Sequence, residues 1–225
     1  MKLNRSKCHL LTRGTPENLW VKVGDETIWE SRSEKLLGVA VDKNLNFEEH
    51  LSTVCKKAGQ KVSALARVVT ILPFQKRRLI LKTFIESQFS YCPMVWMFCS
   101  RKMNRKINFI HERALRLVYY DYSSTFEDLL KKDKSLLFHH RNIHQLATEM
   151  YKVKNGISPV FMNDIFTHRP IRGKDIFARP HVKTVKYGER SLRNFGPIIW
   201  NQMLSENLKF CSSLLSLRLV LVLFP

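Results

Sequence analysis

Apolar residues between positions 47 and 153 recur at intervals of three and four, the spacing that places side chains on one face of an α-helix. The longest such stripe, from Leu51 to Val69, predicts a helix of about five turns. The pattern returns over Lys102–Tyr119 and Phe138–Val153, and shorter helices are expected over Thr125–Lys132 and Pro159–Phe166. The middle of the chain is therefore predicted to be a succession of amphipathic helices.

The residues that flank these stripes indicate where the helices begin and end. Asn46 with Glu49 matches the capping box that opens a helix, and Ser124 with Glu127 does the same for the short helix that follows. Asn155-Gly156 is a typical helix stop.

A further helix is expected between Pro73 and Pro93. Its inward-facing residues are predicted to be Leu79, Ile80, Phe84 and Ser87. Pro93 must end or kink it, because proline lacks the N–H donor and clashes with the preceding turn. Aromatic residues and methionines gather around this point, namely Phe89, Tyr91, Met94, Trp96, Met97 and Phe98. They are interpreted as a packed corner of the core in preference to a platform that stacks bases.

Before the helices, the pattern changes to short alternating runs. Trp20–Val23 and Thr27–Trp29 flank Gly24-Asp25, which predicts a β-hairpin. Lys7–Thr12 is another short run, and Leu36–Val41 predicts a third strand whose internal glycine marks a bulge or a close backbone approach. Such a small sheet requires a covering helix for stability.

The chain after residue 166 is less regular. Residues 167–190 are expected to form a basic loop, with a short strand over Val185–Tyr187, and Gly196-Pro197 is expected to open a last helix. The apolar run Leu214–Phe224 is too short to cross a bilayer, which needs about 20 residues. Without an apolar segment behind Met1, the chain is expected to be nuclear or cytoplasmic, neither secreted nor membrane-spanning.

The predicted fold class is α+β and mostly α: a small N-terminal antiparallel β-sheet or hairpin followed by a basic helical bundle. Residues 1–45 would hold the sheet and residues 46–120 the bundle. Residues 121–166 would form a helical extension, and residues 167–225 a basic irregular segment with a terminal helix.

Charge then points to a class of partner. Lysine and arginine number 38 against 19 acidic residues, giving a formal net charge of +19. Such an excess attracts polyanions by releasing their counterions, and nucleic acid is favoured over an anionic membrane or a merely solvated surface. The basic residues on the predicted helices are the candidate phosphate contacts: Lys56, Lys57, Lys61, Arg67, Lys76, Arg77, Arg78, Lys82, Lys102, Arg105, Lys106, Arg113 and Arg116.

Other chemistry finds little support. The chain has no Asp-Asp pair to hold catalytic Mg²⁺, and its Glu48-Glu49 and Glu127-Asp128 pairs fit helix starts better. His140 and His144 have a metal-binding spacing but lack a third ligand, so surface or phosphate-contacting histidines are favoured. The scattered cysteines, five in number, indicate reduced thiols. Catalytic residues, metal ligands and cofactors are therefore all expected to be absent.

Several ordered motifs share a further resemblance. They are Leu36-Leu37-Gly38-Val39 with Asp42, Leu45-Asn46-Phe47 with His50, Gln88-Phe89-Ser90-Tyr91-Cys92-Pro93-Met94-Val95-Trp96, His111-Glu112-Arg113-Ala114-Leu115-Arg116, Glu149-Met150-Tyr151-Lys152-Val153 with Asn155-Gly156, and Phe195-Gly196-Pro197 with Ile199-Trp200. In this order they resemble the region that follows the active site in reverse transcriptases of non-LTR (LINE-type) retrotransposons.

The resemblance implies a map of function. Residues 1–45 would be the end of the palm, with Leu36, Leu37 and Gly38 in a primer-grip-like hairpin. Residues 46–120 would be a thumb that holds an RNA or DNA template–primer duplex, and the remainder a C-terminal extension. The catalytic carboxylates, at which the family binds Mg²⁺, would lie before Met1. The expected function is that of a polymerase fragment, inactive on its own, that retains template–primer binding; the alternative is a decayed or domesticated helical interaction protein.

Overall fold

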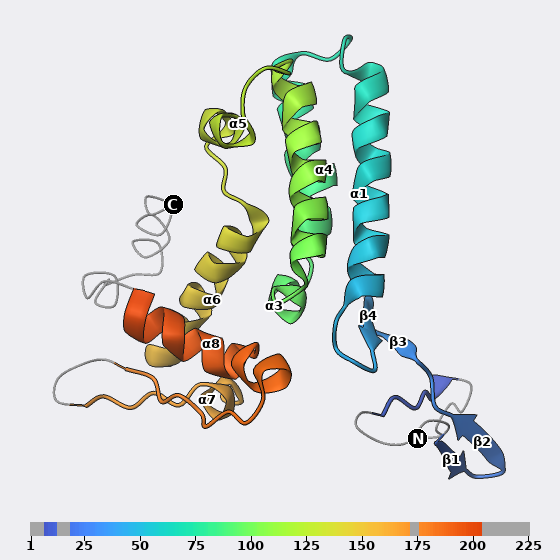
Figure 1. The fold of residues 1–225 in the computed structure, drawn as a ribbon, viewed down its shortest axis with the longest axis vertical. Coiled ribbons are helices and arrows are strands. Elements are labelled where there is room, and N and C mark those ends of the chain that lie inside the picture. The colour runs from blue at the N-terminus through green and yellow to red at the C-terminus, as the bar shows by residue number, and fades with distance from the viewer. Residues whose placement is uncertain (1–6, 13–18, 172–175, 204–225) are drawn as a thin grey trace. The chain divides into compact units, whose positions relative to one another are not determined.

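The computed structural model describes residues 7–12, 19–171 and 176–203, which divide into two compact units. The first unit comprises Met1–Cys92 with Cys99–Ser123, and the second comprises Pro93–Phe98 with Ser124–Pro225. The predicted fold class is confirmed, since small antiparallel sheets precede a mostly helical remainder (Figure 1). Among the described residues, no helix is both long and apolar enough to cross a membrane.

The predicted N-terminal hairpin is confirmed. Strands β1 (Trp20–Val23) and β2 (Glu26–Trp29) pair antiparallel, with Trp20 opposite Trp29. Gly24 has a φ of 65° at the first position of the two-residue loop, where a type II′ turn requires glycine. In the short run Lys7–Thr12, Leu10 makes an isolated bridge to Glu30.

The predicted third strand is a second hairpin. Strands β3 (Ser33–Leu36) and β4 (Val39–Asp42) pair antiparallel, so the chain reverses direction at Leu37 and Gly38. Both of these residues have positive φ, 46° and 86°, as a type I′ turn requires. The prediction of a single strand over Leu36–Val41 was wrong. The turn within it could not be recognised from the sequence, because leucine is an unusual residue for the first position of a type I′ turn.

Helix α1 (Glu48–Val68) confirms the longest predicted stripe, but its start was assigned incorrectly. Asn46 does not cap it; the cap residue is Phe47, which has a φ of 56° and no side-chain cap bond. The Asp42 carboxylate instead accepts hydrogen bonds from the backbone N–H of Asn44 at 3.0 Å, of Asn46 at 3.2 Å and of Phe47 at 2.6 Å. One carboxylate at the end of β4 thus fixes the entry into α1.

The first unit is built on three helical segments. Helix α1 packs on α4 (Arg101–Tyr119), and the run formed by α2 (Phe74–Ile80), the π-turn η2 (Leu81–Ile85) and the 3-10 turn η3 (Glu86–Phe89) packs against both (Figure 1). The core consists of apolar side chains, including Leu51, Ala58, Val62, Leu65, Ile107, Ala114 and Val118. The buried stripes predicted for α1 and α4 are therefore largely confirmed.

The predicted inner face of the second helix was wrong. Leu79 and Phe84 are 54% and 58% exposed, whereas Leu81, Ile85 and Phe89 are buried. Both stripes have helical spacing, so the apolar pattern did not distinguish them. The stripe that packs against α1 and α4 is the buried one, and Glu86 lies with it: it is only 5% exposed and pairs with buried His111 of α4 at 3.2 Å and with Lys82 at 3.1 Å.

The second unit packs around α6 (Phe138–Lys154), which matches its prediction. Its other elements are α3 (Pro93–Trp96), α5 (Phe126–Asp133), α7 (Met162–Ile165), the π-turn η4 (Val185–Glu189), α8 (Leu192–Ile198) and the π-turn η5 (Ile199–Met203). Its core gathers Met97, Leu146, Ala147, Met150, Tyr151, Phe166, Phe177, Ile199 and Trp200.

Three local predictions in the second unit were wrong. Thr125, not Ser124, caps α5, since its hydroxyl accepts the Asp128 N–H at 3.2 Å. Val185–Tyr187 lies in the π-turn η4 and is not a strand. Pro197 lies inside α8, which Ser191 caps through the N–H of Asn194. The first error arose because Ser124 and Thr125 are adjacent and both have a hydroxyl that can cap a helix.

The residues after Met203, including the apolar run Leu214–Phe224, lie outside the described part of the chain.

For the aromatic corner near Pro93, the core interpretation holds for Phe89, Trp96 and Met97, which are at most 3% exposed. Tyr91 differs: it is 52% exposed, and its hydroxyl donates to the backbone carbonyl of Leu37.

Candidate nucleic-acid interface

All candidate phosphate contacts belong to the first unit. Helix α1 carries Lys56, Lys57, Lys61 and Arg67; the second helical run carries Lys76, Arg77, Arg78 and Lys82; helix α4 carries Lys102, Arg105, Lys106, Arg113 and Arg116. Because these segments pack on one another, the structure brings the residues onto one small bundle.

Some of these side chains already have partners inside the unit. Lys82 pairs with Glu86 at 3.1 Å, and Arg116 pairs with Glu112 at 2.7 Å. Lys61 and Arg77 lie over aromatic rings, with the charged group 5.9 Å and 4.3 Å from the ring centroid respectively. These cations stabilise the bundle, so part of their charge is already satisfied.

Lys102, Lys106 and Arg113 form a more accessible group, termed here the α4 basic face. All three side chains are exposed. Their spacing of four and seven residues places them on one side of α4, over a length of about 16 Å at 1.5 Å per residue. Figure 1 shows α1 and α4 side by side and running in the same direction.

Two interactions relate helix α4, which carries the α4 basic face, to helix α1. At the start of both helices, the Ser100 hydroxyl donates to Glu48 at 3.3 Å. One to two turns further on, burial raises the pKa of the Cys55 thiol of α1, and the positive charge of Lys106 on α4 opposes that rise. Lys56, the next residue of α1, is exposed and adds to the positive charge here.

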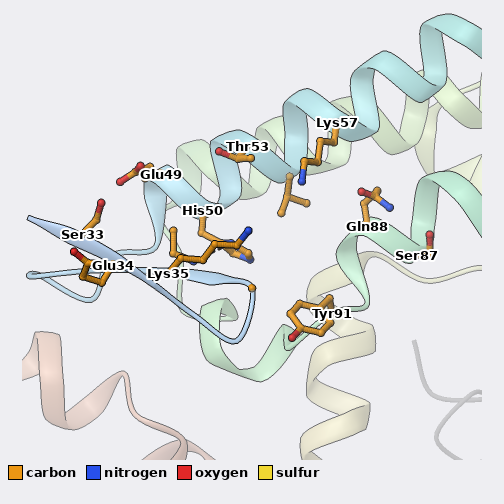
Figure 2. A pocket seen from close by; sticks show the side chains of 13 residues that line it. Ser33, Glu34, Lys35, Glu49, His50, Thr53, Lys57, Ser87, Gln88 and Tyr91 are labelled. Atoms are coloured by element: carbon orange, nitrogen blue, oxygen red, sulfur yellow. Dashed lines mark hydrogen bonds between the residues drawn. The ribbon is translucent and has the colours of Figure 1, made fainter. Parts of the chain in front are cut away.

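A cavity of about 560 Å³ opens between the β3–β4 hairpin, α1 and the segment around Tyr91. Figure 2 shows Lys35 and Lys57 extending into this region from opposite sides, with His50 between the hairpin and the helix. Glu34 and Glu49 also line it, so its charge is mixed. The cavity suits a ligand that has both donor and acceptor groups.

His50 joins the hairpin to α1. Its side chain is buried, and its Nδ1 accepts the Ala40 N–H at 3.4 Å. Burial lowers the pKa of the imidazole, and the nearby Lys57 charge lowers it further. The neutral ring is thus the form that the structure favours, with the proton on Nε2.

The primer-grip-like residues lie at the rim of this cavity. Leu36 and Leu37 are 66% and 84% exposed, and Gly38 lines the cavity itself. A Cβ on Gly38 would lie 3.4 Å from the Tyr91 ring, an ordinary van der Waals distance, so the glycine is explained by its positive φ in the turn and not by the close approach that was expected. Contact of Leu36, Leu37 and Gly38 with a primer stays a prediction.

Sequence reasoning missed the cavity residues Lys35, Thr53, Gln88 and Tyr91 because they come from separate segments. His50, Gln88 and Tyr91 did occur in the motifs of the resemblance, which was the available signal. For metals, the described residues contain no cluster of three or more histidine, cysteine or acidic side chains. His144 lies in α6, where its backbone carbonyl accepts a hydrogen bond from the Thr148 hydroxyl at 2.8 Å.

Comparisons of the chain with protein-family models, with curated proteins and with solved structures give no match. Lysine and arginine bind phosphate oxygens through charge-assisted hydrogen bonds, and arginine does so through a planar fork. Such contacts position a nucleic acid without reading its sequence.

Proposed function

We propose that the first unit binds an RNA or DNA template–primer duplex through its phosphates, as a thumb-like module of a retroelement polymerase. In this proposal the chain binds the duplex and does not catalyse nucleotide addition. The polymerase chemistry belongs to the Mg²⁺-binding carboxylates that the resemblance assigns to the family's palm.

One observation carries the proposal: the α4 basic face presents exposed cations along one line beside α1. A duplex carries one phosphate per about 3.4 Å of axis on each strand, so cations spread over about 16 Å of helix can reach more than one phosphate. The cations at positions 102, 106 and 113 therefore have a repeating anion within reach. The motif order from Leu36 to Trp200 supports the same reading independently of charge.

The proposal is tested by the fluorescence anisotropy of a labelled RNA–DNA hybrid, titrated with the full chain at several salt concentrations. The test variant is K102Q/K106Q/R113Q. The control, K131Q/R179Q/K183Q, removes the same number of exposed cations of the same types from the second unit.

The slope of log K against log[salt] is negative, and each lost phosphate contact should make it less negative by about 0.9. We expect the slope of the test variant to be less negative by about 2.7, and the slope of the control to stay close to that of the wild type. An equal effect of both variants would mean that binding follows net charge and not this face. Absence of hybrid binding at low salt would favour the alternative, a helical interaction protein without a nucleic-acid function.

A further inference from the structure

The bundle of the first unit ends in a group of aromatic and basic side chains. Helices α1 and α4 finish at this end and α2 begins there (Figure 1). The group, termed here the tip patch, consists of Phe74, Arg77, Tyr119, Tyr120 and Tyr122.

Ring contacts and a hydrogen bond hold the tip patch together across two helices. The rings of Phe74 and Tyr119 lie 5.2 Å apart between centroids, tilted by 59°. The Arg77 guanidinium lies 4.3 Å from the centroid of the Tyr120 ring, and its Nη1 donates to the Leu117 carbonyl at 3.5 Å. The patch is therefore a defined arrangement of α2 against the end of α4.

The aromatic rings remain accessible despite these contacts. Phe74, Tyr120 and Tyr122 are 38%, 46% and 65% exposed. Exposed aromatic faces are the surfaces on which unpaired bases stack, whereas bases within a duplex are covered by their neighbours.

Tyr120 occupies a position that does not suit it locally. It is the C-cap of α4, with a φ of 53°, and its N–H bonds to the Arg116 carbonyl. Helices commonly place glycine in this left-handed conformation, because any side chain there is strained. A large, half-exposed aromatic residue at such a site is a local cost that function commonly explains.

The charge around the patch suits a polyanion. Arg67 in the last turn of α1 and Lys76 and Arg78 in α2 are exposed. The acidic residue nearest to Tyr120 in the sequence is Asp121, which is half-buried and accepts a hydrogen bond from the Ser123 hydroxyl at 3.3 Å. Aromatic rings interleaved with cations are typical of surfaces that bind single strands.

We propose that the tip patch binds unpaired nucleotides that adjoin the duplex, with bases stacked on Tyr120 and its neighbours and phosphates held by the flanking cations. This inference rests on the proposed function, because it supposes that a duplex lies along α4. It adds a second binding mode: stacking at the end of the bundle beside phosphate contact along its side.

The test compares a blunt RNA–DNA hybrid with the same hybrid extended by a single-stranded overhang of about six nucleotides, a length within the usual site size. Tyr120→Gly removes the ring and places the preferred residue at the helix C-cap, so the fold should not suffer. Phe74→Ala is a second test variant. Phe161→Ala, at an aromatic residue that is 60% exposed in the second unit, is the control.

We expect the wild type to bind the extended hybrid at least about fivefold more tightly than the blunt one, the low end of the effect of stacking. Tyr120→Gly should abolish that advantage while its affinity for the blunt hybrid is kept, and Phe161→Ala should change neither. A fluorescent 2-aminopurine base in the overhang should be quenched by the wild type and not by Tyr120→Gly.

The outcomes separate the two proposals. If the blunt hybrid binds but the overhang adds nothing, or if Tyr120→Gly keeps the advantage, the tip-patch inference is wrong and the proposed function stands. If the blunt hybrid does not bind, the proposed function fails. Tight binding of the extended hybrid alone, lost in Tyr120→Gly, would then support the tip patch as a single-strand site in its own right.

Discussion

The turn between β3 and β4 allows a sharp test, because Leu37 occupies a left-handed conformation with a φ of 46°. We expect Leu37→Asn to stabilise the protein. Asparagine tolerates this conformation and, with the following glycine, gives the preferred Asn-Gly sequence of a type I′ turn. The Leu37 side chain is 84% exposed, so its loss removes little buried apolar surface.

The magnitude follows from the strain. A left-handed L-residue costs roughly 1–2 kcal/mol, of which asparagine should recover about half. A gain of about 0.5–1 kcal/mol corresponds to a rise in Tm of about 2–6 °C for a unit of this size. The assay is thermal unfolding of the full chain followed by circular dichroism.

The matched control is Leu36→Asn, one residue earlier in strand β3 and 66% exposed. Asparagine is unfavourable in a strand, so this change should lower Tm. If Leu37→Asn lowers Tm as much as Leu36→Asn does, the argument from turn strain is refuted. Because the primer-grip assignment places Leu37 against nucleic acid, hybrid affinity should fall while Tm rises; unchanged affinity would count against that assignment alone.

Three further predictions concern stability. Asp42→Ala should cost about 1–2 kcal/mol in urea unfolding, because three backbone N–H groups before α1 lose their acceptor. Gly196→Ala should cost about 1–2 kcal/mol, mainly in the second unit, since the new Cβ would lie 2.6 Å from the buried Phe166 ring. Burial, and then the Lys57 charge, lower the pKa of His50 from 6.5 in the folded protein. The unfolded chain therefore takes up the proton first, and the free energy of unfolding should fall as the pH drops below about 6.5 towards the lower folded-state pKa.

Each of these has a contrary outcome. A cost of Asp42→Ala no larger than that of Asp25→Ala, at the exposed tip of the first hairpin, would show that the carboxylate does not fix the helix entry. Protection of α8 amides in Gly196→Ala equal to wild type, by hydrogen exchange, would contradict the predicted clash. His50→Gln should flatten the stability difference between pH 7 and pH 5; an unchanged difference would assign it to other groups.

The sequence by itself determined the elements whose signal is local. Helices α1, α4 and α6 were predictable because their apolar residues repeat at helical spacing over many turns, and the β1–β2 hairpin because Gly24 supplies the turn. The basic residues of the candidate interface were likewise visible, since helical spacing alone places Lys102, Lys106 and Arg113 on one side.

The tertiary structure decided what local pattern left ambiguous. The run after Pro73 has two apolar stripes, and packing against α1 and α4 buries one of them, with Glu86 beside His111. The cavity beside the β3–β4 hairpin and the tip patch bring together residues that lie far apart in the chain. Periodicity reports which residues share a face, whereas the partner that covers a face depends on contacts between distant segments, and only the folded chain contains those.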